Sequence, residues 1–240
     1  MIRHLGVNIK EKPTNNINKE QYLLAKPEYM RHWTEEHYPI QRLKASINFD
    51  ANIKFFNSIS KEEFESYLQR KIKKYKFKET TDLSALKEVS GIYLMVLDEY
   101  KQVYVGISTD IKKRILGHWN AKKSLERLIY GDVCNSVLSV DSFGALDTTR
   151  VFYIKTSRLY LDEQRIVDDF EERYTLNRAG GGIGSSDTYT DGKMEAAIAL
   201  IATRRGKDLI PFIDKFEFQK VITISGETRY YAHKYPQLFE

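Results

Sequence analysis

The sequence feature that most constrains the fold is a pair of short apolar segments separated by a polar turn. The first segment, residues 91–97, reads Gly-Ile-Tyr-Leu-Met-Val-Leu, and the second, residues 102–107, is also rich in strand-forming residues. The polar residues 98–101 between them are typical of a turn. Two strands joined by so short a connection pair antiparallel. We therefore predict a hairpin over residues 91–107.

The residues that follow the hairpin predict a helix, a third strand and another helix. Ser108, Thr109 or Asp110 is a suitable N-cap for a helix that runs to about Lys123. Residues 150–155 (Arg-Val-Phe-Tyr-Ile-Lys) predict a strand. Residues 159–174 have apolar side chains at helical spacing and predict an amphipathic helix that ends before Asn177. Helices and strands that follow one another in this way place the chain in the α+β class.

The chain divides into three parts, with boundaries near residues 90 and 184. Residues 1–89 are expected to be mainly helical, poorly ordered up to residue 20 and then helical to about His37, where Pro39 interrupts the helix. A further helix begins near Ser60, whose sequence Ser-Lys-Glu-Glu is a capping box. Residues 184–240 are expected to hold a helix over about 192–204 and a hairpin from Phe216 to Ala232.

The charge of the chain is concentrated in its N-terminal third. The net charge is +5, and residues 1–89 carry 17 Lys and Arg against 12 Asp and Glu, which accounts for all of it. The densest run lies within Arg70–Lys78, where aromatic residues alternate with lysines. Such a run suits contact with a phosphate backbone, and it equally suits a solvated helix face. The composition therefore admits a nucleic-acid partner without requiring one.

One acidic residue is expected to point toward the protein interior. On the helix of residues 159–174, Glu163 falls at the centre of an apolar stripe that includes Ile166, Val167 and Phe170. Burying a carboxylate is costly unless a cation or hydrogen-bond donors compensate. An inward carboxylate at this position therefore suggests a metal ion or a fixed cationic side chain.

Two further candidates lie on the helix after the hairpin. Arg114 and His118 are four residues apart, so they are neighbours along one edge of that helix. A guanidinium stabilises charge on phosphoryl oxygens, and an imidazole moves protons near neutral pH. Taken singly, Arg114 is also consistent with a surface cation and His118 with a hydrogen-bonded residue at the edge of the core.

Together these residues resemble the GIY-YIG nuclease superfamily. The sequence Gly91-Ile92-Tyr93 is followed after ten residues by Tyr104-Val105-Gly106, which differs from the family motif by one valine. The same order continues downstream through four more positions of the family site: Arg114, His118, Glu163 and Asn177. The resemblance covers about residues 90–180 and implies a small three-stranded antiparallel sheet flanked by helices.

The resemblance implies a catalytic mechanism for these six residues. Glu163 is expected to hold one Mg²⁺ or Mn²⁺ ion, and Arg114 to stabilise charge on the scissile phosphate. Tyr93 and Tyr104 are expected to position or deprotonate the attacking water, and since a free phenol has a pKa of about 10, a tyrosine base needs help from Arg114, the metal or His118. Asn177 is expected to fix the local backbone through its amide.

We therefore expect a metal-dependent DNA endonuclease of a stand-alone restriction-like, phage or mobile-element type. The alternative is a non-catalytic nucleic-acid-binding module with the same fold. DNA is the expected partner, and the oligomeric state stays open, a dimer on duplex DNA included. With Cys134 as the single cysteine and no long apolar run or secretory signal, a cytoplasmic protein with no membrane partner is expected.

Overall fold

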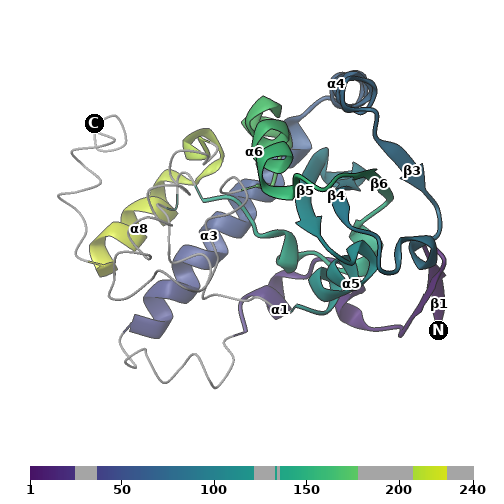
Figure 1. Ribbon diagram of the computed structural model, residues 1–240. Coiled ribbons are helices and arrows are strands. Elements are labelled where there is room, and N and C mark those ends of the chain that lie inside the picture. Colours follow the sequence, from purple (N-terminus) through teal and green to yellow (C-terminus); the bar gives the residue numbers. More distant parts are fainter. Residues whose placement is uncertain (25–36, 122–132, 134–135, 178–207, 226–240) are drawn as a thin grey trace, which may run out of the picture.

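The computed structural model describes residues 1–24, 37–121, 133, 136–177 and 208–225. Within these ranges it contains six α-helices, one two-stranded antiparallel sheet and one four-stranded sheet (Figure 1), so the α+β class is confirmed. No helix of the described ranges is long and apolar enough to cross a membrane.

The four-stranded sheet forms the centre of the molecule, and its strands lie in the order β3, β6, β4, β5. The predicted hairpin is present as β4 (Gly91–Leu97) and β5 (Gln102–Ser108), which pair antiparallel with Tyr93 opposite Gly106. A single 3₁₀ turn connects them over Asp98–Tyr100. β6 (Arg150–Lys155) coincides with the predicted third strand and pairs antiparallel with β4.

The expectation of three strands in this sheet is wrong, because β3 (Lys78–Thr80) adds a fourth at the edge beside β6. It consists of Lys-Glu-Thr and comes from the segment expected to be an N-terminal extension. Three polar residues carry no apolar alternation, and their strand conformation comes from pairing with β6, which lies more than 70 residues away in sequence. Sequence patterns alone therefore could not reveal this strand.

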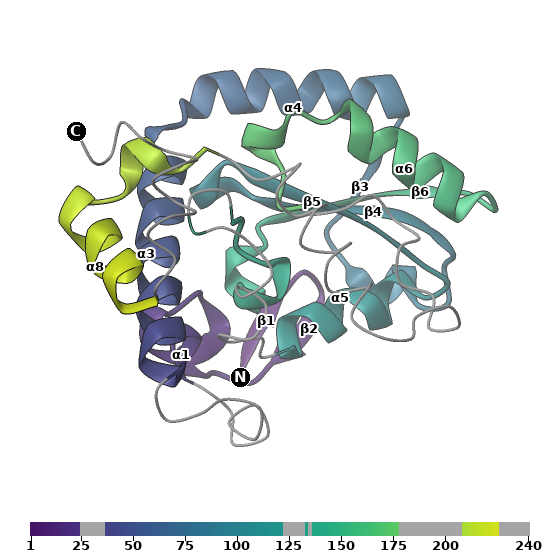
Figure 2. The same ribbon diagram turned by 90° about the vertical axis from the view of Figure 1, so that its left-hand side faces the viewer.

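The two faces of the sheet carry different helices (Figure 2). Alternate residues of a strand point to opposite faces, and those of β4 divide accordingly. Ile92, Leu94 and Val96 belong to the cluster packed by α4 (Lys61–Tyr75) and α6 (Leu159–Asp169), which lie together on one face. Tyr93 and its same-face neighbours belong to the cluster on the opposite face, where α5 (Ile111–Asn120) lies.

Two helices, α4 and α5, begin directly after the capping residues that the sequence predicted. Ser60 caps α4 by accepting a hydrogen bond from the backbone N–H of Glu63, and Asp110 caps α5 by accepting one from Lys113. α5 ends at Asn120, slightly before the predicted end. α6 ends at Asp169, before the predicted end at residue 174: Phe170 and Glu171 are extended, and a separate 3₁₀ turn follows over Glu172–Tyr174.

The N-terminal residues are more structured than expected. β1 (Ile2–His4) and β2 (Val7–Ile9) form a hairpin, and α1 (Lys19–Tyr22) follows. Contacts with distant parts of the chain hold this segment: His4 Nε2 lies 2.8 Å from the carbonyl oxygen of Thr148, and the Leu83 amide donates to the Leu5 carbonyl. The polar composition of residues 1–20 concealed this order, because the contacts are not local.

Two other expectations about the ends of the chain are wrong. α3 (His37–Ser58) begins where a helix was expected to stop and contains Pro39 in its first turn, where a missing N–H costs nothing. α8 (Lys215–Ser225) is a helix where a hairpin was expected, and it packs on α3 (Figure 1). Its buried residues Phe218, Val221 and Ile222 follow helical spacing. The expected helix segment over residues 25–36, the helix over 192–204 and the end of the hairpin over 226–232 lie outside the described residues.

Candidate active site

The two glycines of the hairpin motif permit close approaches that any side chain would block. A Cβ atom on Gly91 would lie 2.1 Å from the carbonyl oxygen of Ile154 on the neighbouring strand β6. A Cβ on Gly106 would lie 2.3 Å from the hydroxyl oxygen of Tyr93. Gly106 therefore allows the phenol of Tyr93 to lie directly over β5, and this places its hydroxyl group beside the edge of the sheet.

The two motif tyrosines lie side by side on the α5 face of the sheet. Tyr93 projects from β4 and Tyr104 from β5, with 6.3 Å between ring centroids. Tyr93 is fully buried and Tyr104 is half-buried. Burial raises the pKa of Tyr104 to about 12 and that of Tyr93 well above its ordinary value, while Arg114 acts in the opposite direction on both. Both phenols are therefore protonated near neutral pH unless another group accepts the proton.

Tyr93 is the first member of a hydrogen-bonded chain that continues through His118. The Tyr93 hydroxyl lies 2.7 Å from His118 Nε2, and His118 Nδ1 lies 2.5 Å from Asp141 Oδ1. A carboxylate accepts hydrogen bonds, so Asp141 favours the tautomer with the proton on Nδ1. Nε2 is then an acceptor, and the Tyr93 hydroxyl donates to it. Both His118 and Asp141 are buried.

Asp141 is a site residue that the sequence did not reveal. It lies in a 3₁₀ turn over Val140–Ser142, in the long connection between α5 and β6. The residues from Ser139 to Asp141 form no recognisable sequence motif. Ser139 caps the turn, because its hydroxyl oxygen accepts a hydrogen bond from the Asp141 amide. A buried acid beside a histidine becomes visible only when the fold brings the two together.

Arg114 lies one helical turn before His118, as the sequence indicated, and its side chain is exposed. Its positive charge lowers the pKa values of Tyr93, Tyr104 and Glu163, in opposition to burial. The arginine thus presents donors to solvent while remaining next to the buried phenols. This is a suitable position for contact with a phosphate at the surface.

Glu163 on α6 is directed inward, as the apolar stripe indicated. Its side chain is only 5% exposed, and among the described residues its Oε2 atom has no hydrogen-bond partner. Burial raises the pKa of Glu163 to about 7, and Arg114 partly opposes this. The charge of Glu163 also raises the pKa values of Tyr93 and Tyr104, so the carboxylate acts on the phenols although α5 and α6 cover opposite faces of the sheet.

Asn177 binds the edge of β5 through its side-chain amide. Its Oδ1 accepts from the amide of Val105 at 2.9 Å, and its Nδ2 donates to the Val105 carbonyl at 2.8 Å. Thr175 donates to the same Oδ1 and forms a parallel bridge with Val103. Asn177 therefore fixes the backbone between Tyr104 and Gly106, and both the oxygen and the nitrogen of its side-chain amide take part in these hydrogen bonds.

The donor set fits a Mg²⁺ or Mn²⁺ ion held by few protein ligands. The described residues contain no group of three or more His, Cys, Asp or Glu side chains that could hold a metal. Mg²⁺, however, is commonly bound by one or two carboxylates together with water and substrate phosphate. The buried Oε2 atom of Glu163, without a partner among the described residues, matches such a ligand.

The basic run of α4 lies away from these residues. α4 covers the face of the sheet opposite to α5 (Figure 2), and two of its lysines, Lys71 and Lys74, form ion pairs with Asp169 at the end of α6. Although burial opposes it, these lysines hold the pKa of Asp169 well below its usual range. Two of the six basic residues of the run Arg70–Lys78 thus join α4 to α6.

No family model matches the chain, and neither a curated protein nor a solved structure matches it. The likeness to the GIY-YIG superfamily therefore depends on the motif residues and on their arrangement. Five of the six sequence candidates, Tyr93, Tyr104, Arg114, His118 and Glu163, are linked by hydrogen bonds, ring contacts or electrostatic interactions. Asn177 acts on the strand that carries Tyr104.

Proposed function

We propose that the chain is a metal-dependent DNA endonuclease of the GIY-YIG type, which hydrolyses phosphodiester bonds. The observation that carries the proposal is the buried carboxylate of Glu163, whose Oε2 atom lacks a partner among the described residues, next to two phenols and an arginine. Keeping an ionised carboxylate in such a place costs stability. A cation that binds this carboxylate together with the substrate would compensate for that loss of stability.

Glu163 would hold the Mg²⁺ or Mn²⁺ ion, with water and a substrate phosphate completing its coordination. Bound there, the ion would supply Lewis-acid stabilisation of charge on the phosphate oxygens. The exposed guanidinium of Arg114 would bind the same phosphate and stabilise the charge that develops in the transition state.

Tyr93 would relay the proton of the attacking water to His118. Its hydroxyl donates to His118 Nε2, so His118 can accept the phenolic proton as Tyr93 takes one from the attacking water. Asp141 is a positioning residue in this scheme, because it orients the imidazole and stabilises the charge that His118 gains. Tyr104, whose ring contacts the rings of Tyr93 and His118, would help to position the attacking water.

The test is cleavage of plasmid DNA by the purified chain with Mg²⁺, beside the variants Arg114→Ala and Glu163→Gln. Each variant is expected to lose cleavage by at least about 10²-fold while still binding DNA. A matched control is Arg158→Ala, which removes an exposed arginine at the start of α6, paired only with Asp162 among the described residues, and is expected to cut normally. Unchanged cutting by Glu163→Gln would refute the assignment of the carboxylate.

The second candidate function is a non-catalytic nucleic-acid-binding module with the same fold. The basic composition and the exposed Arg114 favour it. The same assay separates the two, since such a module retards the plasmid on a gel without cutting it. Mapping the cut ends would show which type of site the chain recognises.

A further inference from the structure

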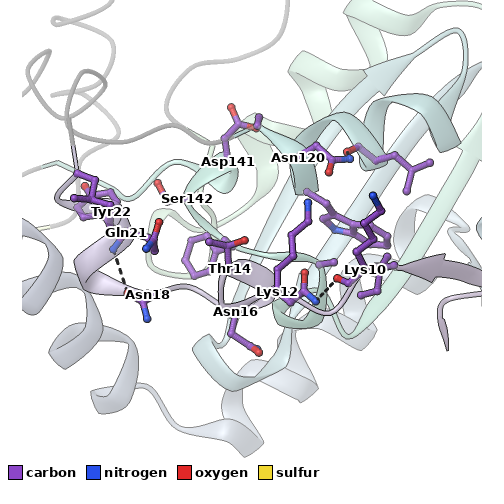
Figure 3. A pocket seen from close by; sticks show the side chains of 18 of the residues that line it. Lys10, Lys12, Thr14, Asn16, Asn18, Gln21, Tyr22, Asn120, Asp141 and Ser142 are labelled. Atoms are coloured by element: carbon purple, nitrogen blue, oxygen red, sulfur yellow. Dashed lines mark hydrogen bonds between the residues drawn. The ribbon is translucent and has the colours of Figure 1, made fainter. Parts of the chain in front are cut away.

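A cavity formed by described residues lies beside the candidate active site rather than within it. It has a volume of about 700 Å³ and lies between the N-terminal segment and the end of α5 (Figure 3). Its N-terminal wall consists of residues from Asn8 to Leu24, and the opposite wall comes from α5 and from the 3₁₀ turn that holds Asp141. We call it the N-terminal pocket.

Specific hydrogen bonds fix the N-terminal wall. The carboxylate of Asp147 accepts from the Ile17 amide at 2.6 Å and from Asn16 Nδ2 at 3.1 Å. Asn15 Nδ2 donates to the Lys10 carbonyl at 2.8 Å, and a Cβ on Gly144 would lie 2.2 Å from the Asn15 backbone. Because side chains from distant segments hold this wall, the pocket is built into the fold.

The lining of the pocket is suited to a nucleotide. Two exposed lysines, Lys10 and Lys12, point into it (Figure 3), and neither has a carboxylate partner among the described ion pairs. Side-chain amides, among them Asn18, Gln21 and Asn120, line part of it, and apolar and aromatic side chains, including the ring of Trp119, line much of the remainder. Lysines bind phosphate, amides pair with the polar edges of bases, and an indole offers a stacking surface.

The pocket reaches the candidate active site through Asp141. This residue lines the pocket, and its Oδ1 atom binds His118, whose other nitrogen binds the Tyr93 hydroxyl. A ligand in the pocket is thus separated from the phenol by the Asp141 carboxylate and one imidazole. Arg114 lies on α5, the helix whose residues Leu116 and Trp119 line the pocket, so a nucleotide next to a phosphate at Arg114 is within reach of it.

We propose that the N-terminal pocket binds a single unpaired nucleotide, with its phosphate at Lys10 and Lys12 and its base among the amides. A volume near 700 Å³ is in the range of small-molecule sites and does not admit a duplex. The nucleotide is one of the DNA strand next to the cleaved bond; a free nucleotide has the same chemistry and is the other possible source. The inference rests on the proposed nuclease function and deepens it.

The test is binding of labelled single-stranded and duplex oligonucleotides, and of a free deoxynucleoside monophosphate, to the full chain without divalent cations. Lys10→Ala/Lys12→Ala is expected to weaken single-strand binding about tenfold and to lower the salt dependence by about two ions. Gln21→Trp, which fills the pocket without changing charge, is expected to weaken it at unchanged salt dependence. The matched controls Lys215→Ala/Lys220→Ala and Gln219→Trp change exposed residues of α8 and are expected to bind normally.

The outcomes separate this inference from the function on which it rests. A wild-type chain that neither cuts plasmid nor binds DNA would overturn both. A wild-type chain that cuts, with pocket variants that bind and cut like the controls, would overturn the pocket alone. If the pocket variants lose the free nucleotide while binding oligonucleotides normally, the nucleotide site is supported and its assignment to the DNA strand is overturned.

Discussion

Replacing Glu163 with glutamine should stabilise the protein at alkaline pH even as it abolishes cleavage. The change keeps the size of the side chain and removes the charge of a carboxylate that is 5% exposed and whose Oε2 atom lacks a partner among the described residues. Burial raises the pKa of this group from 4.5 to about 7. The folded protein therefore holds the Glu163 proton more tightly than the unfolded chain does.

The direction of the effect follows from that difference. Below about pH 4 the carboxyl group is neutral in both states and has no effect. Between about pH 4.5 and 7 the unfolded chain ionises Glu163 while the folded protein keeps it protonated, so wild-type stability falls by about 3 kcal/mol and levels off near pH 8. Glu163→Gln lacks this loss, so it should be more stable than wild type by about 3 kcal/mol at pH 8 and by less than about 1 kcal/mol at pH 5.

Thermal unfolding in a chelator at the two pH values measures this prediction. For a chain of this length the difference at pH 8 corresponds to about 6–12 °C in Tm. Glu172→Gln is the matched control, because Glu172 is exposed and should show no such pH dependence. Adding Mg²⁺ at pH 8 should raise the Tm of wild type and leave that of Glu163→Gln unchanged. A variant that is less stable than wild type at pH 8, or equally shifted at both pH values, would refute the reasoning.

Three further predictions concern the surroundings of the phenols. Gly106→Ala should displace the Tyr93 hydroxyl, destabilise the fold by about 1–3 kcal/mol and reduce cleavage. The control is Gly117→Ala, whose Cβ meets no atom within 4 Å; it should stabilise α5 by about 0.5–1 kcal/mol and cut normally. Asp141→Asn should invert the His118 tautomer and lower the cleavage rate by about 10²–10⁴-fold with little change in DNA affinity; an unchanged rate would exclude the positioning role. Asn177→Ala should cost about 2–4 kcal/mol in urea unfolding because it leaves the buried Val105 amide and carbonyl without partners, whereas the exposed Asn57→Ala should cost less than about 0.5 kcal/mol.

Local patterns in the sequence predicted the central elements well. The hairpin, β6, the caps at Ser60 and Asp110 and the inward direction of Glu163 all depend on neighbouring residues or on a single helical stripe. Hydrophobic periodicity and capping residues indicate such features directly in the sequence.

Features that depend on distant contacts were not predictable in this way. β3 forms by pairing with β6, and the N-terminal hairpin is held by His4 and Leu5 through residues elsewhere in the chain. Asp141 enters the candidate site only because a long connection returns to α5. The C-terminal helix α8 was misread because Phe216, Phe218 and Val221 mix strand alternation with helical spacing.

The edges of the central sheet bear on how two copies of this chain could meet on a duplex. On one side, Leu176 and Asn177 already bond the outward-facing backbone groups of Val103 and Val105. On the other side, β3 offers only three polar residues. Strands with occupied or short, charged edges resist the addition of another strand. Copies that act together on opposite DNA strands are therefore expected to associate through other surfaces or through the DNA itself rather than through these edges of the central sheet.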